Sequence, residues 1–306
     1  MKTTAAGEPV VVDDFVVTDH EFSRFTAFVH RQTGIALNET KRPLVCSRLS
    51  KRLRHYGYVR LRQYYDHLTE RDPTGEELAH MVNALTTNKT EFFREAHHFA
   101  LLRTEILERC ATANGPRRLR VWSAGCSSGE EAYSIAFTVL DGLEDAADWD
   151  VRILASDIDT NVLALATRGV YAANRVAGVP AALRERYLLR GRGPSEGLVR
   201  VRPEVTRLVT FRRINLRDEA WPIRAAFDAI FCRNVLIYFD HALQRRVVRR
   251  LVEHLKPGGY LFLGHSESIS KMPVKFQAIV LNDCILYRKP TVEELQKPEL
   301  VTEGRA

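Results

Sequence analysis

Apolar residues in the first ninety positions recur at three- and four-residue spacing, which is the period of an amphipathic helix. Phe22, Phe25 and Val29 form one such stripe. Four helices are predicted, of which two begin near Thr18 and Pro43 and two cover residues 61–70 and 75–86. The pattern therefore predicts a small all-helical N-terminal domain over residues 15–90.

Beyond residue 118 the pattern changes to short apolar runs that alternate with amphipathic segments. Buried strands are predicted at residues 119–122, 151–155, 208–214, 227–231 and 260–263. Helices are predicted from residue 130, at 160–168 and at 241–255, and a terminal hairpin at 276–280 and 284–287. Strands that alternate with helices indicate βαβ units, so we expect an α/β fold with a mainly parallel sheet.

The stretch between Val170 and Arg207 is too long for a single crossover helix. Within it, Val199 and Val201 alternate with arginines in a strand pattern, and glycines and Pro194 supply turn chemistry just before. We expect a small β-rich insertion at about residues 171–207 that projects from the main sheet.

Cysteine usage and apolar run lengths limit the class of protein. The five cysteines of the 306-residue chain show no C-x-x-C spacing, which argues against a disulfide framework and a zinc site. The longest apolar runs are far shorter than the roughly 20 residues that span a bilayer. We therefore expect a cytoplasmic protein with reduced thiols, no bound metal and no membrane insertion.

The net charge of +7 comes from one stretch of the chain. Residues 41–65 hold eight Lys and Arg residues and no acid, so the remaining 37 bases face 38 acids. A near-neutral body with one basic patch implies an acidic partner, which could be nucleic acid, anionic lipid or an acidic protein surface.

Three predicted strand ends carry residues suited to a nucleoside. Gly125 and Gly129 follow the first strand, Asp157 ends the second and Asn234 follows the fourth. Ligands of open α/β sheets bind at this edge, where a carboxylate can accept hydrogen bonds from ribose hydroxyls. An asparagine at a strand end is equally typical of a simple turn.

The glycine loop disfavours a dinucleotide. Its glycines lie four residues apart rather than in G-x-G-x-x-G spacing, and Glu130 and Glu131 would crowd a pyrophosphate. A nucleoside that carries a positive sulfonium instead of phosphate would suit a carboxylate there. The alternative for Glu130 is a first-turn acid that the helix dipole favours.

Five motifs, taken together, resemble the CheR chemotaxis receptor methyltransferases. They are T-N-K-T-E-F-F-R-E (87–95), W-S-A-G-C-S-S-G-E-E-A-Y-S-I (122–135), A-S-D-I-D (155–159), F-D-A-I-F-C-R-N-V-L-I-Y-F (227–239) and L-K-P-G-G-Y-L-F-L-G-H-S-E (255–267). The resemblance extends over about residues 20–288. It implies a Rossmann-like class I S-adenosylmethionine methyltransferase domain with a seven-stranded sheet at residues 91–290, behind the helical domain.

The resemblance implies methyl esterification of glutamate side chains on methyl-accepting chemotaxis receptors, for sensory adaptation, with S-adenosyl-L-homocysteine as the product. It assigns cofactor binding to Asn88, Thr90, Arg94, Glu130 as the methionyl-side acid, Asp157 as the ribose acid, Asn215 and Leu216 beside the adenine, Arg233 and Asn234. Ala132 stands where the family commonly has proline, and Gly125-Cys126 varies a tolerant loop.

A glutamate acceptor needs positioning rather than a base. Its reference pKa near 4.3 makes it an anion at neutral pH. Arg94 could hold it with a forked pair of hydrogen bonds and Tyr238 with its hydroxyl. The alternatives are an ion pair of Arg94 with Glu91 or Glu95, and a core aromatic at Tyr238.

Receptor contacts are expected at two surfaces. Arg48, Lys51, Arg52 and His55 form a cationic face that could hold an acidic receptor helix, the alternative being a solvated surface. R-G-R-G-P-S-E-G-L-V-R-V-R (190–202) resembles family members that add a receptor C-terminal peptide as a strand to the insertion; the alternative is a plain hairpin.

Two other functions use the same sheet. A nucleic-acid methyltransferase would suit the basic patch, but the fourth strand ends in Arg-Asn-Val-Leu rather than in an acid-Pro-Pro-aromatic motif. A non-catalytic S-adenosylmethionine sensor is the second alternative. We expect a monomer that binds no nucleic acid; the sequence names neither the receptor, the modified glutamates nor the pathway.

Overall fold

The computed structural model describes residues 10–12, 15–112, 116–270, 272, 276–281 and 284–296. The N-terminal part consists of a short hairpin and four helices: β1 (Val10–Val12), β2 (Phe15–Val17), α1 (Asp19–Thr33), α2 (Arg42–His55), α3 (Leu61–Glu70) and α4 (Glu76–Leu85). A capping box between Thr18 and Glu21 starts α1, and Gly34 ends it with a φ of 79°. The four predicted helices are confirmed, while the hairpin was not foreseen.

A seven-stranded sheet follows, and its strand order is β11-β12-β10-β9-β3-β4-β8. The strands are β3 (Arg118–Ala124), β4 (Asp150–Asp157), β8 (Val209–Arg213), β9 (Phe227–Cys232), β10 (Leu255–Leu263), β11 (Gln277–Leu281) and β12 (Cys284–Arg288). The five strands from β10 to the edge strand β8 are parallel, and the terminal hairpin adds two antiparallel strands at the other edge. Strand β10 begins earlier than predicted because residues 257–259 form a register irregularity inside it, between Leu255 and Tyr260.

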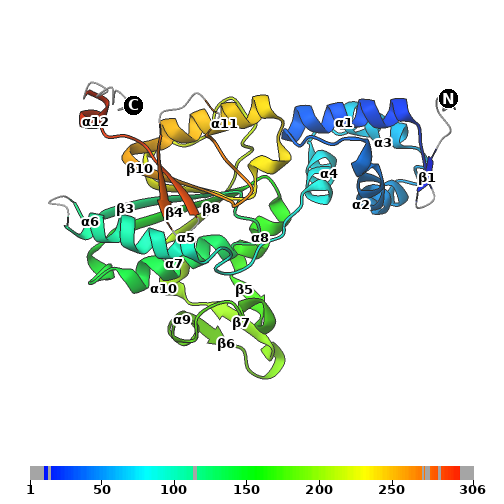
Figure 1. Cartoon of the computed structure of the whole chain (residues 1–306). Coiled ribbons are helices and arrows are strands. Elements are labelled where there is room, and N and C mark those ends of the chain that lie inside the picture. The colour runs from blue at the N-terminus through cyan, green and yellow to red at the C-terminus, as the bar shows by residue number, and fades with distance from the viewer. Residues whose placement is uncertain are drawn as a thin grey trace, which may run out of the picture.

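Helices cover both faces of this sheet (Figure 1). On one face lies α11 (His241–His254), and on the other lie α5 (His97–Leu101), α7 (Glu130–Gly142) and α10 (Pro203–Thr206). The remaining helices are α6 (Glu108–Thr112), α8 (Thr160–Arg168), α9 (Ala181–Tyr187) and α12 (Val292–Gln296). Alternate residues of β3 enter different cores, with Val121 on the α7 side and Trp122 on the α11 side.

The predicted β-rich insertion is a separate three-stranded antiparallel sheet. It contains β5 (Val170–Ala172), β6 (Leu188–Arg190) and β7 (Leu198–Val201), with β7 in the centre. It projects below the main sheet, away from the N-terminal helices (Figure 1). No helix within the described ranges is long and apolar enough to cross a membrane.

A buried carboxylate ties the N-terminal helices together. Glu77 of α4 accepts hydrogen bonds from Arg52 Nε at 2.9 Å, from the Tyr56 hydroxyl at 2.9 Å and from the Tyr64 hydroxyl at 2.5 Å. Burial alone would raise the pKa of Glu77, but these donors outweigh it and hold that pKa below its ordinary value. Arg52 therefore points into the protein, and the expectation that it faces a partner is wrong.

Replacement of this carboxylate should destabilise the protein. We expect Glu77→Gln to lower the free energy of unfolding by about 3 kcal/mol, because Arg52 then keeps a half-buried charge without its anion. The Glu77 contribution is present above the ordinary value of 4.5 and is lost as the pH falls through the depressed pKa of the folded state. Urea unfolding followed by circular dichroism measures both effects. Exposed Glu76→Gln on the same helix is the control, and equal losses for the two variants would contradict the assignment.

Candidate active site

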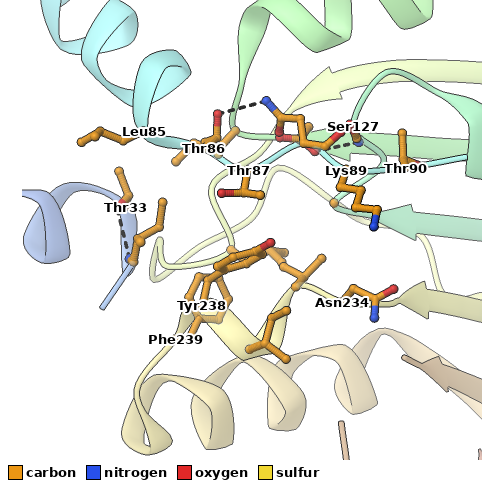
Figure 2. Close-up of a pocket in the computed structure, with 18 of the residues that line it drawn as sticks. Thr33, Leu85, Thr86, Thr87, Lys89, Thr90, Ser127, Asn234, Tyr238 and Phe239 are labelled. Carbon is orange, nitrogen blue, oxygen red and sulfur yellow. Dashed lines mark hydrogen bonds between the residues drawn. The ribbon is translucent and has the colours of Figure 1, made fainter. Parts of the chain in front are cut away.

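A pocket of about 470 Å³ opens where the carboxyl ends of the parallel strands face the linker from the helical part (Figure 2). The loops after β3, β4, β8 and β9 line it, together with residues 85–91 and the chain that follows α1. In Figure 2, Tyr238 reaches towards the linker residue Thr87, and Asn234 lies beside a strand end. The edge of the sheet at which the sequence predicted ligand binding therefore contains a cavity.

Two glycines let the loop after β3 approach the pocket closely. Gly125 and Gly129 have φ values of 88° and 96°, in the left-handed region that favours glycine. A Cβ atom on Gly125 would lie 2.4 Å from Cγ2 of Val235, which is another pocket residue. Any side chain here would have to displace that wall.

Asp157 ends β4 and faces the pocket with an ordered carboxylate. Its Oδ2 accepts from the Ser127 backbone N–H at 2.8 Å, and its Oδ1 accepts from the Asp159 N–H at 3.0 Å. Burial raises the pKa of Asp157 above its ordinary value, against the lowering effect of the backbone N–H groups of Asp159, Ser127 and Ile158. Each oxygen keeps a lone pair, so the carboxylate can still accept two hydrogen bonds from a ligand.

The linker is fastened to the sheet edge by Asp159. Its Oδ2 accepts from the Thr86 hydroxyl and from the Asn88 amide, both at 2.7 Å. Asn88 and Thr90 lie in the pocket wall as predicted. The Asn88 amide group, however, is directed to Asp159, so this residue fixes the linker over the pocket.

Arg233 is buried directly after β9 and connects three parts of the chain. Its guanidinium lies 3.1 Å from Glu131 Oε2 and 3.0 Å from Glu95 Oε2, and it donates to the Arg94 carbonyl. Its neighbour Asn234 also lines the pocket and has a φ of 58°. The side-chain Oδ1 of Asn234 is buried without a hydrogen-bond partner among the described residues.

Of the two adjacent glutamates, Glu131 lines the pocket and Glu130 does not, so the prediction of Glu130 is corrected. The Glu130 carboxylate is fully buried, is ion-paired with Arg175 and accepts from Ser128 Oγ at 2.8 Å, outside the wall. Glu131 lines the pocket and accepts from Ser123 Oγ at 2.6 Å. Burial raises the pKa of Glu131, although Arg233 and Ser123 favour its anion.

An apolar slot lies beside these polar groups. Leu216 is in the wall with Ile158 and Ile214, while Asn215 donates its amide N–H to the Gln32 carbonyl at 2.8 Å. Asn215 and Leu216 therefore both line the pocket, and their place beside an adenine stays a prediction. The slot has the apolar character that a purine ring requires.

The N-terminal part contributes wall residues that no sequence motif indicated. The backbone N–H of Ala36 donates to the Tyr238 carbonyl at 2.8 Å, and Ile35 forms a β-bridge with Phe239. These contacts bring the chain after α1 against the loop that carries Tyr238. Local sequence patterns could not predict these contacts, because the two segments lie about two hundred residues apart in the sequence.

Arg94 and Tyr238 both line the pocket, and their role in orienting an acceptor stays a prediction. Arg94 Nη1 donates to the Lys89 carbonyl at 3.1 Å, which bends its side chain back along the linker. Lys89 is a further, exposed cation in the pocket wall, and the sequence motifs assigned it no role.

The cationic face of α2 differs from the prediction. Arg48 donates to the carbonyls of Leu85 and Thr86, at 2.7 and 2.9 Å, and so caps the end of α4. With Arg52 also turned inward, Lys51 and His55 remain exposed as expected. Arg54 is exposed on the same side of the helix, three residues after Lys51.

Two models of known protein families match this chain. A model described as CheR methyltransferase, SAM binding domain, matches residues 88–285, and one described as CheR methyltransferase, all-alpha domain, matches residues 20–86. SAM is S-adenosylmethionine, so the sheet edge and its pocket belong to the part of the family that binds this cofactor.

Curated relatives agree over most of the chain. Chemotaxis protein methyltransferase 2 of Pseudomonas aeruginosa is 48% identical over 83% of this chain and 89% of its own. Chemotaxis protein methyltransferase of Escherichia coli K12 is 42% identical over 87% of this chain and 90% of its own. The chain belongs to the CheR family of S-adenosylmethionine-dependent methyltransferases.

Proposed function

We propose that this methyltransferase esterifies glutamate side chains on methyl-accepting chemotaxis receptors, using S-adenosylmethionine and releasing S-adenosylhomocysteine. Its curated relatives are named chemotaxis protein methyltransferases. The observation that carries the proposal is the division of charge across the pocket. On the sheet side the carboxylates of Asp157 and Glu131 outnumber the one cation, Arg233, and on the linker side the cations Lys89 and Arg94 outnumber the one acid, Glu91.

The sheet-side residues fit a sulfonium nucleoside. Asp157 keeps two free acceptor positions for ribose hydroxyls, and Glu131 supplies negative charge. The orphaned Oδ1 of Asn234 offers a buried acceptor to an ammonium group, which would satisfy it. Leu216 with its apolar neighbours suits adenine.

The chain's own residues position the acceptor and exclude water. When bound, S-adenosylmethionine supplies a methyl group on a positively charged sulfur. Arg94 can hold a carboxylate with two parallel hydrogen bonds, and the Tyr238 hydroxyl can donate a third. The acceptor is already an anion at neutral pH, so positioning and desolvation supply the rate.

Receptor helices meet the protein, in this proposal, along the exposed side of α2. Lys51, Arg54 and His55 are exposed there, and Lys41 and Leu44 nearer the start of the helix line the pocket. A cationic stripe that ends at the pocket would attract an acidic helix and bring its glutamates to Arg94. The proposed helical N-terminal domain, residues 15–90, thus faces the receptor, and residues 91–290 form the methyltransferase domain.

The three-stranded insertion is proposed as a docking point for a receptor C-terminal peptide. Its edge strands are β5 and β6, and Val170 and Leu189 on them expose about 37% and 40% of their surface. An extended peptide could add to such an edge through backbone hydrogen bonds. We further propose that the protein acts as a cytoplasmic monomer.

Label transfer tests the reaction class. The full chain is mixed with methyl-labelled S-adenosylmethionine and receptor-containing membranes, and the product is then treated with mild alkali. We expect volatile labelled methanol, because a carboxyl methyl ester hydrolyses under these conditions. Alkali-stable label would contradict the proposal and favour nucleic-acid methylation. Cofactor binding without label on any receptor would favour a sensor.

Substitutions of the two adjacent glutamates should have different effects on cofactor affinity and on stability. We expect Glu131→Gln to weaken S-adenosylmethionine binding about tenfold, or ~1.4 kcal/mol, because it removes the wall carboxylate. Glu130→Gln should lower thermal stability, because it leaves Arg175 without its buried partner, and should leave that affinity unchanged. Isothermal titration and thermal unfolding measure the two effects. A weaker affinity in Glu130→Gln alone would restore the sequence-based assignment.

Arg94 should act on the rate more than on cofactor binding. We expect Arg94→Ala to lower kcat about a hundredfold, or ~2.7 kcal/mol, by loss of acceptor orientation, with cofactor Kd changed less than about threefold. Arg94→Lys keeps the charge without the fork and should recover only part of the rate. Arg117→Ala, far along the chain in an exposed ion pair, is the control. Full activity of Arg94→Ala would remove this residue from the mechanism.

A further inference from the structure

Three histidines and a glutamate gather behind Arg94, where the end of the linker meets the loop after β10. One ligand atom each of Glu95, His97 and His98 lies within 4.8 Å of the others. From the opposite side, His265 Nε2 approaches to 3.1 Å from His97 Nε2 and 3.9 Å from Glu95 Oε2. Three potential metal ligands are thus grouped in one segment, and His265 contacts two of them, His97 and Glu95, from a distant part of the sequence without belonging to the mutual group.

Two of these ligand atoms are buried and unsatisfied. His98 is only 1% exposed, and its Nδ1 has no hydrogen-bond partner within the part of the chain that the structure describes. Oε2 of Glu95 lies 3.4 Å from that nitrogen and also accepts no hydrogen bond, although Arg233 Nη2 forms an ion pair with it at 3.0 Å. Buried polar atoms without a hydrogen bond are rare, so the His98 nitrogen is the stronger indication of a missing ligand.

The donor set and spacing favour one class of ion. Imidazole nitrogens and a carboxylate oxygen bind zinc at about 2.0–2.2 Å, which puts neighbouring ligands of a tetrahedral site about 3.4 Å apart. The separations of 3.1 Å between His97 and His265, and of 3.4 Å between Glu95 and His98, agree with this spacing, whereas the 3.9 Å between His265 and Glu95 would have to shorten when a metal binds. Calcium and magnesium prefer oxygen ligands and are disfavoured. We propose that Glu95, His97, His98 and His265 bind one divalent transition-metal ion of the zinc class.

The surrounding charge supports a cation. Glu95 and Glu131 contribute two negative charges around Arg233, which contributes one positive charge, so the cluster carries an excess of one carboxylate. Arg233 retains Glu131 at 3.1 Å when Glu95 turns to a metal. The ion pair between Arg233 and Glu95 therefore competes with a metal ion for Glu95, but it does not prevent the metal from binding.

A metal here would join two walls of the pocket. Glu95 follows Arg94 directly, whereas His265 belongs to the loop whose Glu267 accepts from the Asn234 N–H at 2.7 Å. Coordination would fix both segments and raise the melting temperature, because the ion binds only the folded arrangement. This inference depends on the fold and not on the proposed acceptor.

Direct titration of the full chain tests the site. Chelator-stripped protein is titrated with Zn²⁺ against a chromophoric chelator, and with Co²⁺ while its visible d–d absorption is recorded. We expect one equivalent to bind with a Kd of about 1 μM or tighter, together with a rise in Tm and a tetrahedral Co²⁺ spectrum.

Variants distinguish this site from surface binding. His97→Gln and His265→Gln change accessible ligands and should each weaken binding at least about tenfold. The exposed His80→Gln is the matched control and should bind as the unmodified chain does. Circular dichroism verifies folding, and His98→Gln is avoided because that side chain is buried. Absence of stoichiometric binding, or equal binding by all variants, would overturn the proposal and leave His97 and His265 as a hydrogen-bonded pair.

Discussion

The buried guanidinium of Arg233 is the interaction on which the pocket depends. It meets Glu131 at the start of α7 and Glu95 in the linker, donates to the Arg94 carbonyl and lies over the Phe99 ring. A charge with a side chain only 2% exposed is tolerable only when anions compensate its desolvation. Because each anion comes from a different segment, the same ion pairs that solvate Arg233 also fix the glycine-loop helix against the linker.

Backbone strain concentrates around the same place. Phe93, Glu95, Ser127 and Asn234 all have positive φ values near 50–60°, although none is glycine. Such conformations cost about 1 kcal/mol or more each and persist only where the surroundings enforce them. The enforcing contacts are visible: the Phe93 N–H donates to Ser134 Oγ at 2.9 Å, the Ser127 N–H to Asp157 and the Asn234 N–H to Glu267. Strain and hydrogen bonding together hold the pocket ready for a ligand.

Local patterns in the sequence predicted the elements well because their causes are local. The capping box at Thr18 and the left-handed glycines at the end of α1 and the start of α7, Gly34 and Gly129, are features of residues within one turn. The strand-end rule likewise placed Asp157 and Asn234 in the pocket wall. The remaining departures involve side-chain direction, which depends on tertiary packing.

Three such departures share one physical origin. Adjacent residues of a helix point about 100° apart, so Glu130 and Glu131 could not be told apart before the sheet was placed against α7. Arg52 turns inward because Glu77 is buried beside it, which the charge count of residues 41–65 could not reveal. The histidine cluster was invisible because His265 lies more than 160 residues after His97. Cysteine spacing addressed only thiolate metal sites, whereas this candidate site uses imidazoles and a carboxylate.

The charge arrangement also bears on how products would leave, if the proposed reaction is the one performed. Before transfer, Asp157 and Glu131 face a cation while Arg94 faces an anion, so both walls gain electrostatic stabilisation in a partly desolvated pocket. Methyl transfer from sulfonium to carboxylate leaves a neutral thioether and a neutral ester. Both walls then lose their ionic partners at the same step, while Arg233 still holds Glu131 in place at 3.1 Å. The same pocket therefore holds the neutral products less strongly than the charged reactants, which assists product release.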